Sequence, residues 1–172
     1  PVAGTGSAIS FGFQTSAGTY SVLATNATTS CTSNMTGTAA VSINPLPTGY
    51  SVTGGGSYCA GGTGVNVGLA SSNVGINYQL YNGPATVGGP IAGTGSPLNF
   101  GLMTASGTYT VLATNTTTSC TNVMVGSVNV VSNPLPAAFA VTGGGSYCAG
   151  GTGVHVGLAF SNSGVNYQLY NG

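Results

Sequence analysis

The stretch VTGGGSYCAGGTGV at Val52–Val65 determines how this chain is organised, because the same fourteen residues occur again at Val141–Val154. The match extends well beyond this stretch. When residues 1–83 are aligned with residues 90–172, about two thirds of the positions are identical and no gap is needed. Equivalent residues are therefore 89 positions apart. This period predicts a tandem array of one domain type, since the turns of solenoid proteins are far shorter.

Short runs of alternating apolar and β-branched residues, bounded by Gly, Asn, Ser or Pro, predict an all-β domain within each period. Residues 65–69 and 76–80 alternate in this way and predict two strands. Two longer strands are expected at 107–115 and 123–132. About seven short strands without a helical period favour a β-sandwich with Greek-key strand order.

The motif Asn-Pro-Leu-Pro, at Asn44–Pro47 and again at Asn133–Pro136, predicts the domain boundaries. Proline cannot continue a central strand, and it stiffens the chain that follows. We therefore expect one complete domain at 48–136, the C-terminal half of a domain at 1–47, and the N-terminal half of another at 137–172.

The chain has no Lys, Arg, Asp or Glu, and its only histidine is His155. Acid–base catalysis, phosphate binding and nucleic-acid binding depend on those charged side chains. We therefore expect no enzymatic activity, no cofactor or metal site, and no nucleic-acid partner. His155 has no carboxylate or second histidine to work with, so it is expected to be a surface residue without a chemical role.

No apolar run approaches the roughly 18 residues of a membrane-spanning helix, and no signal-peptide pattern is present. Four cysteines in a small glycine-rich chain favour an oxidising, extracellular environment.

Each period contains one cysteine before the strand at 65–69 and one in the turn between the last two strands. If Cys59 opens the first strand, it lies near Cys120 and the two form a disulfide within one domain; Cys31 and Cys148 then form the equivalent bond between successive units. If Cys59 instead lies in the loop that enters the next strand, a disulfide would join stacked neighbours. Free thiols are the third alternative. The first arrangement is the prediction, and the distance between the Cα atoms decides it.

Two segments, SAGTYSV at Ser16–Val22 and ASGTYTV at Ala105–Val111, resemble the strand-F signature of immunoglobulin-like domains. Tyr20 and Tyr109 occupy the tyrosine-corner position, and a valine stands where antibody domains have the strand-F cysteine. The order of motifs over a whole period is similar to the Ig-like or PKD-like repeats of very large secreted surface proteins of Bacteroidota. The resemblance covers nearly the whole chain. It implies tandem Ig-like sandwiches in an extracellular stalk, adhesin or fibre.

The predicted function is a structural repeat unit of an extracellular bacterial filament or adhesin stalk, with copies of itself as partners. A surface without charged side chains has no electrostatic repulsion between copies of the protein, which favours association. The alternative is an adhesin repeat that binds glycan or a host surface through loops rich in tyrosine, with Tyr58, Tyr78 and Tyr81 as candidates.

Only Pro84–Gly89 lacks an equivalent, so the chain starts and stops at one point of the repeat. Neither incomplete half can bury its apolar face alone. We expect residues 141–172 of one unit to pack against residues 1–47 of the next. The contact would form either between separate chains or within one continuous protein.

Overall fold

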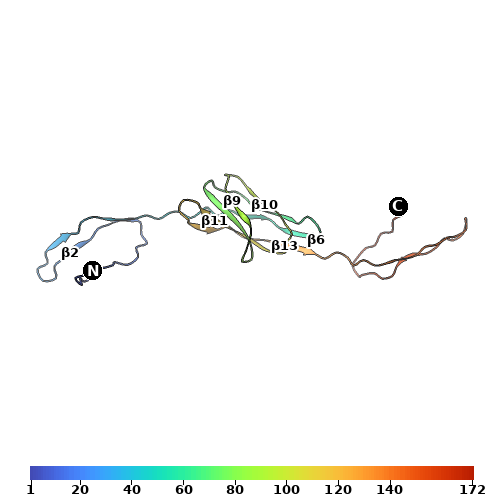
Figure 1. Ribbon diagram of the computed structural model, residues 1–172, viewed down its shortest axis with the longest axis horizontal. Coiled ribbons are helices and arrows are strands. Elements are labelled where there is room, and N and C mark those ends of the chain that lie inside the picture. The colour runs from blue at the N-terminus through green and yellow to red at the C-terminus, as the bar shows by residue number, and fades with distance from the viewer.

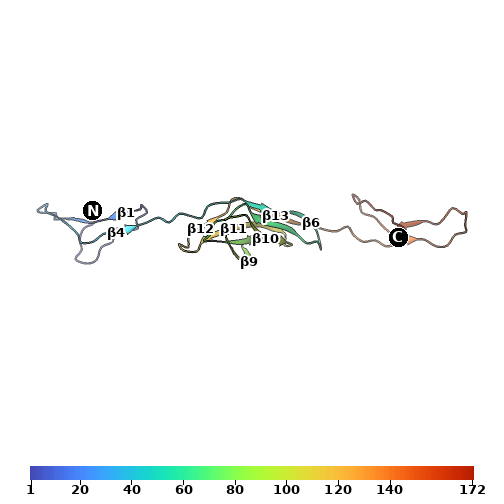
Figure 2. The ribbon, with the colours of Figure 1, turned by 90° about the horizontal axis from the view of Figure 1, so that it is seen from above.

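The computed structural model covers residues 1–172 and consists of strands and connecting loops, arranged as a central domain with one segment at each end. The three parts lie in a line in both views (Figures 1 and 2). The 12 buried hydrophobic residues all lie between Val67 and Val130, and the end segments contribute none of them. The prediction of an all-β protein is confirmed, and no helix could cross a membrane.

The central domain has nine strands in two sheets that enclose one core. One sheet has the order β10-β7-β5. The other has the order β6-β13-β11-β8-β9, with β12 also paired to β11. The strands are β5 (Val52–Gly54), β6 (Gly56–Cys59), β7 (Val65–Leu69), β8 (Ile76–Asn82), β9 (Ala85–Ala92), β10 (Leu98–Met103), β11 (Gly107–Asn115), β12 (Thr121–Val123) and β13 (Val128–Asn133).

Alternation along the strands builds the core. In β8 the side chains of Ile76, Tyr78 and Leu80 are buried, while the residues between them are half-exposed. Strand β11 repeats the pattern, and its tyrosine, valine and alanine face the same interior. Burying a Leu or Val side chain contributes roughly 1.5–3 kcal/mol, so these two strands supply much of the stability.

The single strand expected at 123–132 is wrong, because the structure divides it into β12 and β13. Between these two strands, Val125 does not pair with β11 and instead forms two backbone hydrogen bonds with the chain at the start of β5. Its N–H donates to the carbonyl of Tyr50, and its carbonyl accepts from the N–H of Val52, both at 2.9 Å. Gly126 follows with φ of 75°, a left-handed conformation that suits glycine and turns the chain back towards β11.

The N-terminal segment contains two short antiparallel pairs. Strand β1 (Gly18–Tyr20) pairs with β4 (Ala39–Val41), and β2 (Leu23–Thr25) pairs with β3 (Thr32–Asn34). These strands repeat the pairing of β11 with β13 and β12 in the same register. For example, Gly18 pairs with Val41 as Gly107 pairs with Val130.

The C-terminal segment contains one pair, β14 (Val141–Gly143) with β15 (Val156–Leu158). It repeats the pairing of β5 with β7, again in the same register. Val141 pairs with Leu158 as Val52 pairs with Leu69. Both end segments therefore contain parts of the central domain's strand pattern.

Candidate assembly site

Of the stretches of the end segments that form no strand although their equivalents in the central domain do, two are the longest. Residues 165–171 correspond to β8, and residues 9–14 correspond to β10. In the central domain, β8 pairs with β11 and β10 pairs with β7. The equivalent of β11 lies in the N-terminal segment, and that of β7 lies in the C-terminal segment. Each of the two stretches therefore has its natural partner in the opposite end segment.

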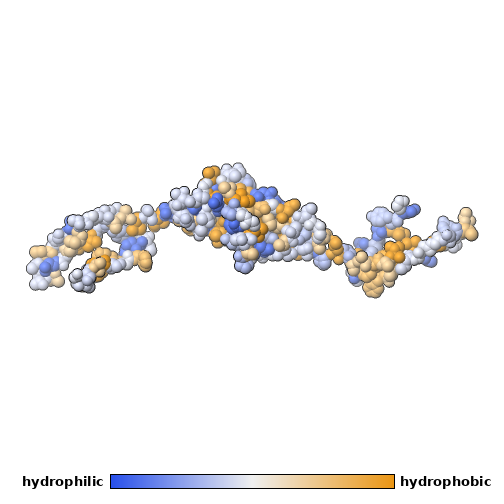
Figure 3. Space-filling view, in the orientation of Figure 1, coloured by the Kyte–Doolittle hydropathy of each residue, from blue (hydrophilic) through white to orange (hydrophobic).

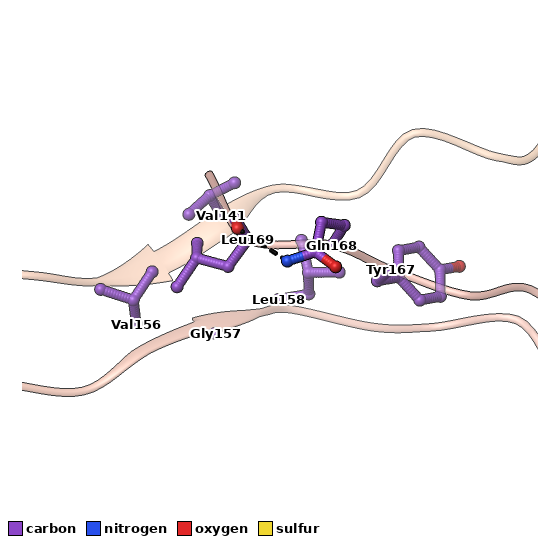
Figure 4. Close-up of a pocket in the computed structure, with 7 residues that line it drawn as sticks. All are labelled: Val141, Val156, Gly157, Leu158, Tyr167, Gln168 and Leu169. Carbon is purple, nitrogen blue, oxygen red and sulfur yellow. Dashed lines mark hydrogen bonds between the residues drawn. The ribbon is translucent and has the colours of Figure 1, made fainter. Parts of the chain in front are cut away.

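The C-terminal segment has an open hollow of ≈ 370 Å³ in place of a core (Figure 4). Tyr167 is 43% exposed and Leu169 is 68% exposed, whereas their equivalents Tyr78 and Leu80 are both 0% exposed. The lining residues, all labelled in Figure 4, are Val141, Val156, Gly157, Leu158, Tyr167, Gln168 and Leu169. The segment thus presents the inner face of a sandwich without its other half.

The glutamine in this hollow makes only one of the hydrogen bonds that its equivalent in the central domain makes. Gln168 Nε2 donates to the carbonyl of Leu169 at 3.1 Å, the bond drawn dashed in Figure 4. Its equivalent, Gln79, makes the same bond but also donates to the carbonyls of Val87 and Gly88 in β9, at 3.2 and 3.3 Å. Val87 and Gly88 lie within Pro84–Gly89, which has no equivalent in either end segment, so joining the two segments alone would not supply these two acceptors.

The N-terminal segment has a larger hollow of ≈ 850 Å³. Its apolar lining includes Tyr20, Val22, Met35 and Val41, the equivalents of buried core residues of the central domain. Met35 is 45% exposed where Met124 is 3% exposed. Figure 3 shows apolar surface on both end segments, not only on the central domain.

The two hollows correspond to two halves of one core. The C-terminal hollow carries the equivalents of core residues from β7 and β8, and the N-terminal hollow carries those from β11, β13 and the residue after β12. Each half exposes the side chains that the other half would cover. The sequence pattern identifies the segments but not these residues, although the 89-residue offset from a predicted core locates them.

Local hydrogen bonds in the end segments match those of the central domain. The hydroxyl of Tyr20 donates to the carbonyl of Ser16 at 2.9 Å, as Tyr109 does to Ala105 at 2.7 Å. In the C-terminal segment, the N–H of Asn162 donates to the Tyr167 hydroxyl, as in the equivalent pair of the central domain. The end segments therefore contain part of the local hydrogen bonding of the central domain.

The structure does not support the predicted disulfide of Cys59 with Cys120, since both thiols are free. The predicted bond of Cys31 with Cys148 would join two units, so the free thiols of one chain do not decide it. Strand β6 begins after β5 and ends at Cys59, so this cysteine does not open the first strand. Cys59 lies opposite Asn133, at the end of the domain where β11 begins.

Cys120 lies at the other end of the domain, where its carbonyl accepts from the N–H of Asn115, the last residue of β11. Cys59 and Cys120 are separated by the length of β11 and by the end of β13 from Val130 to Asn133. At about 3.3 Å per residue this is roughly 35 Å. A disulfide needs Cα atoms within about 7 Å. By the same register, Cys31 and Cys148 would lie at opposite ends of a completed domain.

The remaining candidate residues have ordinary structural surroundings. Tyr78 is in the core, and the Tyr58 hydroxyl donates to the carbonyl of Thr104, so neither forms an open aromatic surface. Burial, and then the neighbouring Tyr58, raise the pKa of Tyr109 above its ordinary value. His155 is exposed just before β15.

The comparisons with known proteins add no relative. No protein-family model and no curated protein matches this sequence. The case for a function therefore depends on the geometry of the two open half-domains.

Proposed function

We propose that the chain is a structural repeat unit of an extracellular bacterial filament or adhesin stalk, and that its units join head to tail by completing split domains. Residues 137–172 of one unit would supply the front strands of a sandwich, and residues 1–47 of the next unit would supply the back strands. The observation that carries the proposal is the distribution of strand pairs. Strands pair within an end segment where it contains both equivalents of a central-domain pair. The stretches that stay unpaired have the equivalents of their partner strands in the opposite segment.

We infer that the repeated domain is an immunoglobulin-like sandwich with a Greek-key strand order and an 89-residue period. Three features support this: the two-sheet strand order, the parallel pairing of β6 with β13 at the sheet edge, and the tyrosine hydroxyl bonded four residues upstream in two copies. The resemblance of the motifs to repeats of secreted Bacteroidota surface proteins agrees with an extracellular location.

The positions of the two half-domains favour a linear polymer. They lie at opposite ends of the long axis in both views (Figures 1 and 2). A contact between different surfaces at opposite ends of a molecule extends the assembly without closing it, unless a rotation brings the chain round into a ring. No side chain of Lys, Arg, Asp or Glu opposes the approach of copies.

Assembly of the purified chain tests this proposal. We expect elongated polymers in electron micrographs and a loss of monomer in light scattering. Leu169→Asn places an amide in the completed core and should weaken assembly at least tenfold, because burying an unpaired polar group costs about 1–3 kcal/mol in addition to the lost apolar contact.

Leu102→Asn is the matched control, since Leu102 is an exposed leucine on a formed strand of the central domain. It should leave assembly unchanged. A wild-type chain that stays monomeric at high concentration would contradict the proposal. Equal loss of assembly in the two variants would also contradict it.

A further inference from the structure

The central domain has one cysteine near each of its two Asn-Pro-Leu-Pro linkers. At the linker that follows the central domain, Cys59 pairs with Asn133, the first linker residue. The N–H of Ala60 also donates to the Asn133 carbonyl at 2.8 Å, which fixes β6 against the start of the linker. The Cys59 side chain is exposed there.

The other cysteine lies at the linker that precedes the central domain. Asn122 Nδ2 donates to the carbonyl of Pro47, the last linker residue, at 2.8 Å. The N–H of Val125 donates to the Tyr50 carbonyl, so the chain leaving the linker runs parallel to the chain from Asn122. Cys120 precedes Asn122 by two residues, which at about 3.3 Å per residue places it within roughly 7 Å, along the chain, of this contact with the linker.

The two linkers occupy equivalent positions of the repeat. A linker between two complete domains would therefore have one cysteine from the domain before it and one from the domain after it. The cysteine of the preceding domain lies level with the first linker residue. Extended back in parallel from the contact of Asn122 with Pro47, the cysteine of the following domain would lie level with the second. Successive residues of a proline-rich linker advance by about 3.1 Å. This offset along the linker is shorter than the Cα separation of about 4.4–6.8 Å that a disulfide spans, so the offset by itself does not keep the two cysteines apart.

We propose that disulfides cross the linkers and join successive domains. Cys59 of one unit bonds to Cys31 of the next unit, and Cys148 bonds to Cys120 of the next unit. This inference rests on the proposed head-to-tail assembly. Both bonds connect successive units, so two disulfides would join each pair of neighbouring units. A single chain does not bring these partners together, which accounts for its four free thiols.

The oxidation needs an acceptor of two electrons, which is a small-molecule disulfide such as oxidised glutathione. One cysteine thiolate attacks that disulfide, releases one glutathione thiolate and forms a mixed disulfide. The second cysteine thiolate then displaces the other glutathione. The two protons lost by the protein thiols pass to the two released glutathione thiolates, so the protein pair is oxidised as the small disulfide is reduced.

The pairing can be tested in a fusion of two full chains, joined through the six residues of Pro84–Gly89 that close the equivalent turn in the central domain. The first copy carries Cys31→Ser and Cys120→Ser, and the second carries Cys59→Ser and Cys148→Ser. Four cysteines remain, on the two sides of one completed domain. The fusion is incubated with oxidised glutathione and its peptides are mapped by mass spectrometry without reduction.

We expect the free thiols of the fusion to fall from four to none, with Cys59 linked to Cys31 and Cys148 linked to Cys120. Four thiols that stay free or carry glutathione would overturn the inference, and so would a bond between Cys148 and Cys31 within the completed domain. Polymerisation of the wild-type chain under reducing conditions is measured separately. If the wild-type chain polymerises but the fusion forms no disulfides, the disulfide proposal is wrong and the assembly proposal stands. If the fusion forms the disulfides but the wild-type chain does not polymerise, the assembly proposal is wrong.

Discussion

At the scale of single residues, the duplicated glycine-rich stretch is explained by how closely two strands approach. Gly54 has φ of 88°, and a Cβ atom built there would lie 2.1 Å from the carbonyl oxygen of Asn66 in β7. The equivalent Gly143 has φ of 85° and would meet the carbonyl oxygen of His155 at 2.1 Å. Only glycine allows this conformation together with this contact, so the residue is needed in both copies.

Gly54→Ala is therefore expected to lower the free energy of unfolding by about 2 kcal/mol or more, since left-handed strain adds to the clash with backbone. Denaturant titration of the chain, at a concentration where it is monomeric, measures the loss. Gly89→Ala is the control, because no atom lies within 4 Å of the added Cβ and φ is not left-handed. It should change stability by less than about 0.5 kcal/mol. Equal effects of the two substitutions would show that the contact with Asn66 is unimportant.

At the scale of elements, a strand in this protein forms only where its neighbour is present. The segment 165–171 keeps the alternating apolar pattern of β8, yet it forms no strand, because the equivalent of β11 is in the other end segment. Strand propensity alone does not satisfy backbone N–H and C=O groups, and a lone strand remains solvated. The ordering of this segment should therefore accompany assembly.

Amide hydrogen exchange tests this expectation. In the monomer, we expect the amides of 165–171 to exchange rapidly and those of β8 to be protected, because only β8 lies between two hydrogen-bonded neighbours. In the polymer, both segments should be protected. The exposed residues 94–96, between β9 and β10, provide the control, since they should exchange equally in the two states. Slow exchange of 165–171 in the monomer would contradict the proposed role of this segment as a donated strand.

At the scale of the whole molecule, the absence of charged side chains sets how assembly responds to the solvent. No salt bridge can form between side chains of the chain, because Lys, Arg, Asp and Glu are all absent. The contact between half-domains would depend on apolar burial and backbone hydrogen bonds. These interactions are not weakened by the ions that screen exposed charges.

Polymer yield should consequently change less than about twofold between roughly 0.01 and 0.5 M sodium chloride, a range over which the Debye length falls from about 30 Å to a few ångströms. Sedimentation of the polymer measures the yield. A protein whose contacts depend on ion pairs serves as the control and should dissociate over the same range. Dissolution of the polymer by salt would show that charges contribute to the contact.

Much of the architecture follows from the sequence alone. The alternation of β7, β8 and β11 predicts strands that the structure contains, because period-two apolar patterns need only one buried face. The 89-residue offset also identifies which positions of the end segments are equivalent to the core. Both properties are local or repeated, so they can be read without knowing how distant segments meet.

Other properties were decided only by tertiary structure. The single strand expected at 123–132 is divided because Val125 bonds to residues that are more than seventy positions earlier in the chain. The cysteine pairing depends on which end of a sheet each cysteine reaches, and that follows from β6 lying parallel to β13. Strand direction and the choice of neighbour are non-local, so sequence spacing placed Cys59 and Cys120 together where the fold holds them apart.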